Sequence, residues 1–149
     1  MGLLSPILRD GAGNLLTWWC PGCNSAHQVR AVVRQAAVIE PDPDNPDWTP
    51  PREYYEARDG AWTWNGSATK PTFQPSVLVK GSEFTDAGRA AYESWFAAGC
   101  PQPSPLRFES RDTCCHSFVV DGRMQFLSDC THSLAGQTVL IPDWPTGGV

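Results

Sequence analysis

The sequence predicts a single domain that is mainly β, of the α+β class, in which a small antiparallel sheet of hairpins carries one helix. The chain has 149 residues, 41% of them hydrophobic, which is the size of one ordinary domain with a buried core. Its 14 prolines and 13 glycines are spread along the chain as turns between short segments. Two dipeptides of hairpin-turn type, Asn65-Gly66 and Asp121-Gly122, each follow a run of β-forming residues. We therefore expect residues 1–149 to form one domain.

The N-terminal part is predicted to form two strands around a tight turn. The segment "LLTWWC" (15–20) is a short run of β-forming residues, and "CPGC" (20–23) is a turn. The segment "AHQVRAVVRQAAVIE" (26–40) continues as a strand, although its last part is also compatible with a helix. The acidic, proline-rich segment 41–52 is expected to be a surface loop, because proline removes backbone donors and fixes φ.

A hairpin and a helix are predicted for the middle of the chain. Asn65-Gly66, within "AWTWNGSATKPTFQPSVLVK" (61–80), is expected to join two strands. The segment "TDAGRAAYESWFAAG" predicts a helix near 85–98, because Thr85 can cap its N-terminus and Gly99 can end it.

The segment "SFVVDGRMQFL" (117–127) predicts a second hairpin, with Asp121-Gly122 as its turn. If Val120 pairs with Arg123, the same register places Ser117 opposite Phe126. The open end of this hairpin would then gather four residues with metal-binding side chains, which are Cys115, His116, Cys130 and His132. A last short strand is expected in "QTVLIPDW" (137–144).

Cys20 and Cys23 have the C-x2-C spacing in which a turn points two sulfurs at one ion. Together with the C-terminal hairpin, this knuckle predicts a zinc-ribbon-like site with zinc as the cofactor. Four ligands are expected from six candidates, which are Cys20, Cys23, Cys115, His116, Cys130 and His132. Neighbouring residues of a regular strand face opposite ways, so only one of Cys115 and His116 should bind. The sequence does not choose among the six.

His27 and the aromatic segment around Asn65-Gly66 each allow a functional and a purely structural interpretation. His27 follows the knuckle and either supports the metal ligands or is a buried strand histidine with a backbone partner. The aromatic segment around the first hairpin could present a surface for a protein partner or could be cross-strand packing. The candidates for such a surface are Trp62, Trp64, Asn65 and Phe73.

Composition excludes several classes of function. The net charge is −5, and no stripe of Lys or Arg could follow a phosphate backbone, so nucleic acid is not an expected partner. No run approaches 18 consecutive apolar residues, so no membrane association is expected. The first residues lack the features of a signal peptide, so the protein should not be secreted. Its six cysteines therefore indicate metal binding or catalysis before disulfides.

Four segments resemble a family of small phage-encoded proteins of unknown function, often labelled "ammonia monooxygenase". These segments are "WWCPGC", "WTWNG", "KPTFQPSVLV" and "CHSFVVDGRMQFLSDCTHSLAGQTV". The family is distantly similar to bacterial proteins encoded near ubiquitin-like conjugation enzymes. The resemblance implies a phage origin, hence a place in the host cytoplasm or in the virion, and a zinc-binding fold. The oxygenase label does not suit this chain, because membrane spans are missing and copper favours histidine-rich sites.

We expect a non-enzymatic phage protein whose zinc is structural and which acts by contact with a phage or host protein. Four thiolate or imidazole ligands would close the coordination sphere. The alternative is a zinc-dependent hydrolase, a peptidase or amidase, in which Asp129 or His132 relays protons for a zinc-bound water. A second alternative is a thiol redox protein that uses Cys20 and Cys23.

Overall fold

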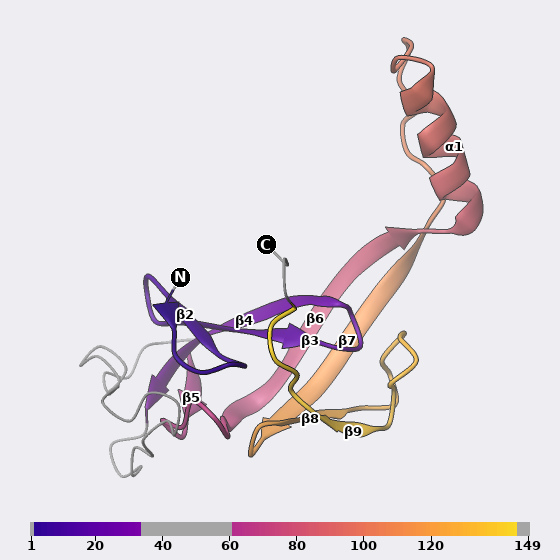
Figure 1. Cartoon of the computed structure of the whole chain (residues 1–149). Helices are drawn as coiled ribbons and strands as arrows, with labels where there is room; N and C mark the ends of the chain where they lie inside the picture. Colours follow the sequence, from indigo (N-terminus) through magenta and orange to yellow (C-terminus); the bar gives the residue numbers. More distant parts are fainter. Residues whose placement is uncertain (1, 34–60, 146–149) are drawn as a thin grey trace.

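The computed structural model describes residues 2–33 and 61–145. Within them the chain forms one helix and a single sheet of nine strands, whose order in space follows their order in sequence (Figure 1). All neighbouring strands are antiparallel except β4 and β5, which are parallel. The elements are β1 Gly2–Leu3, β2 Arg9–Gly11, β3 Leu15–Cys20, β4 Ser25–Val33, β5 Trp62–Trp64, β6 Phe73–Phe84, α1 Asp86–Ala97, β7 Ser110–Val120, β8 Arg123–Phe126 and β9 Thr138–Leu140. In the part of the chain described, no helix is long and apolar enough to cross a membrane.

The mainly β class with one helix is confirmed, but the sheet is larger than predicted and mixed rather than purely antiparallel. A parallel pair needs a long connection, and the stretch between Val33 and Trp62 supplies one. The predicted helix is confirmed as α1, with Thr85 accepting the backbone N–H of Gly88 as its N-cap. The strand predicted at 15–20 is β3, while the predicted loop at 41–52 lies outside the described residues.

The two predicted hairpins differ in outcome. The Asp121-Gly122 hairpin has the predicted register, with Val120 opposite Arg123 and Ser117 opposite Phe126. Both turn residues have positive φ, at 49° and 75°, as a type I′ turn requires. The Asn65-Gly66 segment joins β5 to β6 through a longer loop, because Trp64 pairs with Phe73. The Asn65 side chain forms this loop by accepting the amides of Ser67 and Thr72 and donating to the Lys70 carbonyl.

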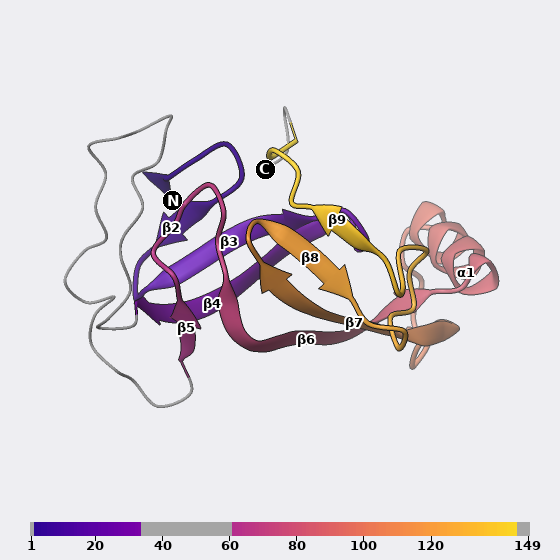
Figure 2. The same ribbon diagram turned by 90° about the horizontal axis from the view of Figure 1, so that it is seen from below.

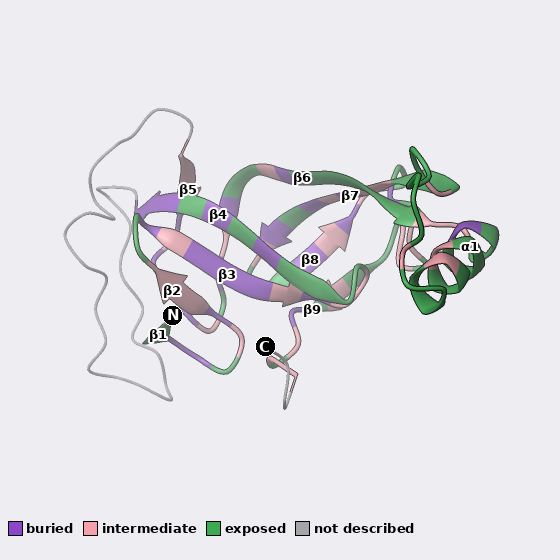
Figure 3. Cartoon of the chain, turned by 90° about the horizontal axis from the view of Figure 1, so that it is seen from above, coloured by how far each residue is buried: buried purple, intermediate pink, exposed green. Residues whose placement is uncertain are grey.

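The sheet curls so that β3 and β4 lie across from β7 and β8 (Figure 2). Trp18 of β3 stacks on Phe73 of β6 with ring centroids 5.2 Å apart, which joins the two halves of the chain. Buried positions follow β3, β4 and β8, whereas α1 and the outer part of β6 are exposed (Figure 3). Of the residues suggested as a partner surface, Trp64 and Phe73 are core residues with 1% exposure each, and Trp62 and Asn65 are half-buried.

The outer parts of β6 and β7 form a two-stranded ribbon that extends beyond the core and carries α1 at its far end (Figure 1). The helix packs closely on the start of β7, because a Cβ on Gly88 would collide with the backbone carbonyl of Glu109. Tyr92 of α1 also stacks on Phe84, with ring centroids 5.4 Å apart. Gly88 therefore has a packing role that outweighs its low helix propensity.

We predict that Gly88→Ala releases α1 from the ribbon. The added methyl group would force the helix away from Glu109, at a cost of about 1–3 kcal/mol that exceeds the ~1 kcal/mol gained in helix propensity. Arg89→Ala, at the exposed neighbouring position, is the matched control. Urea unfolding followed by far-UV circular dichroism should show loss of helical signal at lower urea for Gly88→Ala only. Equal transitions for both variants would contradict the contact.

Candidate active site and metal centre

A bulge in β6 positions Ser76 beside β7. The pairing between the two strands shifts register from Phe73 opposite Val119 to Val77 opposite Ser117, so residues 74–76 face the single residue Phe118. Bulges of this kind re-aim side chains and are common next to active sites. Ser76 is half-buried, and its carbonyl accepts the indole N–H of Trp62 at 3.3 Å.

Ser76, His116 and Asp129 form a chain of hydrogen bonds. His116 Nε2 lies 3.0 Å from Ser76 Oγ, and His116 Nδ1 lies 3.1 Å from Asp129 Oδ2. A carboxylate can only accept, so Nδ1 carries the proton and Nε2 is free to accept the serine hydroxyl. This is the arrangement in which an imidazole can remove the proton of a hydroxyl nucleophile while a carboxylate fixes its tautomer.

The turn that carries Asp129 is hydrogen-bonded to the backbone of β7 at Cys114 and at His116. Leu127 N–H donates to the His116 carbonyl at 2.9 Å, and Thr131 N–H donates to the Cys114 carbonyl at 2.9 Å. The Cys130 thiol sulfur accepts the His116 N–H and the thiol donates to the His116 carbonyl, both at 3.2 Å. Cys130 therefore holds the histidine through its main chain while Asp129 holds it through the ring.

The hydrogen-bonded chain is open to solvent. The side chain of Asp129 is 55% exposed and that of His116 is 25% exposed. A large molecule can therefore reach Ser76 and His116 without a deep pocket having to open.

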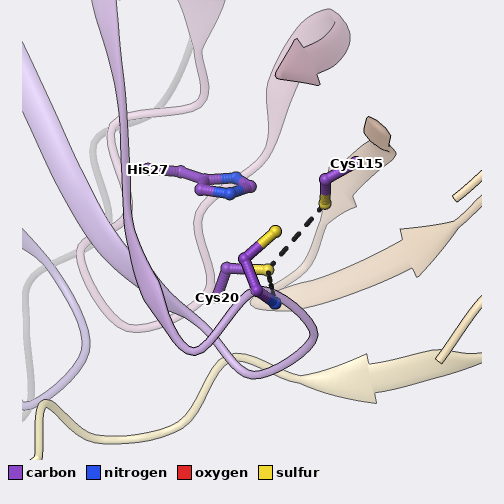
Figure 4. Close-up of side chains that lie close together, drawn as sticks. Cys20, His27 and Cys115 are labelled. Atoms are coloured by element: carbon purple, nitrogen blue, oxygen red, sulfur yellow. Dashed lines mark hydrogen bonds between the residues drawn. The ribbon is translucent and has the colours of Figure 1, made fainter. Parts of the chain in front are cut away.

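A second cluster lies on the inner side of β7, where Cys115 points away from the Ser76 side. Cys20, Cys23, His27 and Cys115 have their potential ligand atoms within 4.8 Å of one another. Figure 4 shows Cys20, His27 and Cys115 directed toward one point, with Cys20 Sγ 3.9 Å from Cys115 Sγ. Two sulfurs that each lie ~2.3 Å from one zinc ion at the tetrahedral angle are about 3.8 Å apart. The cluster therefore has the size of a tetrahedral metal site.

His27 suits the fourth position better than His132. His27 is 4% exposed, and among the described residues neither of its ring nitrogens has a hydrogen bond of good geometry, although the ring helps to lower the pKa of Cys20. His132 Nδ1 accepts the Leu134 N–H at 3.2 Å, so its Nε2 carries the proton of the neutral ring and donates to Cys115 Sγ at 3.3 Å. A metal would satisfy the buried His27, while His132 stabilises the Cys115 thiolate.

The thiols affect one another strongly. The Cys115 thiol donates to Cys20 and lowers the pKa of Cys20 to about 4, although burial opposes this shift. Burial and the negative charge of Cys20 raise the pKa of Cys23 to about 11. The pKa of Cys115 is raised because its thiol hydrogen-bonds to Cys20 and is buried. Once Cys20 is a thiolate, its negative charge therefore opposes the deprotonation of Cys23 and Cys115. A divalent cation bound by the three sulfurs would offset that repulsion.

The structure divides the six predicted ligand candidates into three groups. Cys20, Cys23 and Cys115 lie together and His132 contacts Cys115. The His116 ring bonds to Ser76, and the buried Cys130 sulfur bonds to the His116 backbone near Cys115 and His132. A second possible metal group, of Cys115, Cys130 and His132, would cost the hydrogen bond that the Cys130 thiol donates to the His116 carbonyl. The selection of four ligands from those six stays a prediction, and His27 is an additional candidate.

Sequence reasoning did not pair Ser76 with His116, although the two side chains lie at hydrogen-bond distance. Ser76 stands in "QPSVL", which carries no nucleophile motif, and 39 residues lie between it and His116 in the sequence. Only the register of β6 on β7 brings the two together, and the intervening helix hides that pairing from any local pattern.

A protein-family model described as "Bacterial ubiquitination-like system serine protease (BubE)" matches residues 4–127. This span exceeds half of the chain. The chain belongs to the BubE family. No curated protein and no solved structure matches it. The matched span contains Ser76 and His116, while Asp129 lies just beyond it.

Membership of the BubE family corrects the functional prediction. The expectation of a non-enzymatic phage protein with a structural, contact-based role is wrong, because the family is one of proteases. The alternative of a peptidase agrees better with the family, whose description names serine chemistry rather than a zinc-bound water. The resemblance to proteins encoded near ubiquitin-like conjugation enzymes is consistent with the family, whereas the phage origin stays a prediction.

We predict that Co²⁺ added to the metal-free protein binds with one ion per chain and gives thiolate-to-metal charge-transfer absorption. His27→Ala should change this spectrum and weaken binding by more than about 100-fold, because a ligand is lost. His132→Ala should keep the spectrum and weaken binding by about 10-fold, because only a hydrogen bond to a ligand is lost. Cys100→Ser, in the loop after α1, is the control. The reverse order of effects for the two histidines would contradict this ligand set.

Proposed function

We propose that the protein is a serine peptidase in which Ser76 is the nucleophile, His116 the general base and acid, and Asp129 the residue that orients His116. Two hydrogen bonds of the His116 ring support this proposal: Nε2 accepts the Ser76 hydroxyl at 3.0 Å, and Nδ1 donates to Asp129 at 3.1 Å. The family supports it, because its description names a serine protease of a bacterial ubiquitination-like system. We place the substrates among the proteins and conjugates of such a system.

The geometry performs peptide hydrolysis in two stages. Ser76 Oγ attacks the carbonyl carbon of the scissile bond and gives its proton to His116 Nε2. His116 then gives that proton to the amine nitrogen, the C–N bond breaks, and an acyl ester on Ser76 remains. Water attacks this ester with His116 again as base, which releases the carboxylic acid and restores the Ser76 hydroxyl. Asp129 accepts Nδ1–H throughout and stabilises the imidazolium that forms twice per cycle.

We propose that the cation of the second cluster is zinc and that its role is structural. Three thiolates with one imidazole are the donor set that zinc prefers, and four protein ligands leave no open position for a catalytic water. Cys115 would tie β7 to the N-terminal knuckle, while the next residue, His116, faces Ser76. The metal would therefore support the peptidase by fixing the strand that carries its base.

We predict that Ser76→Ala and His116→Ala each lower kcat/KM for peptide cleavage by at least about 10⁴-fold, because either change removes the nucleophile-base unit. Asp129→Asn should lose less than ~10⁴-fold, since its exposed carboxylate shares the orienting role with water. The substrate is a tryptic digest of a bacterial proteome, with cleavage sites read by mass spectrometry. A fluorophosphonate probe should label Ser76 in the wild type and nothing in Ser76→Ala.

Ser94→Ala, an exposed serine of α1, and Asp86→Asn, at the start of that helix, are the matched controls and should cleave like the wild type. Cleavage that survives in Ser76→Ala would sink the serine mechanism. Cleavage by Ser76→Ala that stops at once on chelation would point instead to a zinc-bound water.

We predict that removal of the metal by a chelator at neutral pH lowers both the thermal stability and the peptidase rate, and that added Zn²⁺ restores both. A ligand that binds only the folded state stabilises that state, so its loss costs free energy of unfolding. Ser76→Ala should retain one zinc and the wild-type Tm, which separates the two clusters. Metal-free protein with full stability and full activity would contradict the supporting role.

A further inference from the structure

The edge of β6 that leads away from Ser76 is unpaired among the described residues. Strand β5 pairs with β6 only at Phe73 and Gln74, whereas β7 pairs with β6 as far as Phe84. Residues 78, 80, 81, 82 and 83 are exposed. Half of the surface of Leu78, 50%, is accessible to solvent. An open edge begins at the bulge that carries Ser76 and runs along the ribbon.

Hydrogen bonds on the far side of β7 determine which backbone groups face this edge. The carbonyls of Cys114 and His116 accept the amides of Thr131 and Leu127, so those two residues of β7 point their backbone groups away from β6. Backbone groups alternate in direction along a strand, so the β6 partners of the intervening residues of β7 point toward β7. These partners are Val77, Val79 and Gly81. The residues that point N–H and C=O outward are therefore Leu78, Lys80 and Ser82.

Ser76 belongs to the same alternating set. Its carbonyl faces the β5 side, where the Trp62 indole donates to it at 3.3 Å. The line from Asp129 through His116 to Ser76 thus crosses β7 and β6 and ends at the open edge. A carbonyl carbon placed for attack by Ser76 would lie beside this edge, next to outward-facing amides and carbonyls in strand spacing.

We propose that the peptidase binds its substrate as an added β-strand along residues 76–82 of β6. This inference rests on the proposed function and specifies its substrate class, an extended segment of polypeptide with free backbone groups. Main-chain hydrogen bonds from Leu78, Lys80 and Ser82 align the segment, as in other cases of strand addition. Folded domains are excluded unless they present such a segment. Leu78 and Phe118, which is 42% exposed, offer apolar surface to substrate side chains near Ser76.

Proline substitution at the edge tests the proposal, because proline removes an N–H and is tolerated on the open side of an edge strand. Lys80→Pro deletes an outward amide and leaves the β6–β7 pairing intact. Asp112→Pro is the matched control: it is exposed, lies opposite Ser82, and directs its amide to the other edge of the same ribbon. Cleavage of the tryptic proteome digest reports strand addition, and hydrolysis of p-nitrophenyl acetate reports the Ser76–His116 chemistry alone.

We expect Lys80→Pro to lower digest cleavage by about 5- to 10-fold, the equivalent of one hydrogen bond, with ester hydrolysis within twofold of the wild type. Asp112→Pro should cleave the digest at the wild-type rate. Wild-type cleavage by Lys80→Pro, or an equal loss in Asp112→Pro, overturns the proposal. If the wild type hydrolyses the ester but cleaves no peptide of the digest, the proposed peptidase function is wrong. The proposal that β6 binds a substrate strand then fails as well.

Hydrogen exchange of the backbone amides tests the binding of a substrate strand without any proline substitution, so an effect of proline on the fold cannot confuse the result. In Ser76→Ala, saturation with the best-cleaved peptide of the digest should slow exchange at Leu78, Lys80 and Ser82. The amides of Val77, Val79 and Gly81 already face β7 and should not change. Unchanged exchange at the outward amides, or slowing confined to other strands, would show that the substrate binds elsewhere.

Discussion

The pairing of β6 with β7 determines most of what this molecule can do. It holds Ser76 and His116 at hydrogen-bond distance although they come from opposite sides of a helix in the sequence. The same register places Cys115 opposite Val79, on the inner side, where it meets the N-terminal knuckle. The β6–β7 pairing also extends further along β6 than the β5–β6 pairing does. The edge of β6 beside Ser76 is therefore left open among the described residues. A single set of backbone hydrogen bonds thus organises the Ser76–His116 pair, the cysteine cluster and the open edge.

Strand β7 has one face for each kind of chemistry. Cys115 and His116 are neighbours in sequence and point to opposite sides, and Cys130 and Asp129 repeat this relation in the following turn. The buried side holds the Cys20 and Cys115 sulfurs, with the exposed Cys23 at the rim, and the exposed side holds a solvated carboxylate and an imidazole. The cysteine cluster and the Ser76–His116–Asp129 chain therefore lie on opposite faces of the same strand. In the proposed peptidase, Ser76 and His116 would need no deep cavity, because a metal bound by the cysteine cluster would hold the strand beneath them.

The sequence predicts local features of this fold well and long-range ones poorly. The register around Asp121-Gly122, the strand at 15–20 and the capped helix after Thr85 all follow from short-range chemistry and are confirmed. Three of the six ligand candidates, Cys20, Cys23 and Cys115, lie together, but the sequence alone does not choose among the six. The contacts of His116 with Ser76 and Asp129 could not be found in this way, because metal ligation and proton transfer would use the same side chain. The difference depends on Ser76, whose position requires a bulge and a pairing that skips α1.

The alternation along β7 has a consequence for how such a chain can change during evolution. A substitution at Cys115 or His116 alters one cluster at a time, but the insertion of one residue between Cys114 and Cys115 would exchange the two faces. The imidazole would turn toward the sulfurs and the thiol toward Ser76, so both clusters would fail in one event. The length of this segment is therefore constrained more tightly than the identity of any single side chain in it. Descendants of this protein can lose either chemistry by point mutation, but they can keep both only by conserving the spacing.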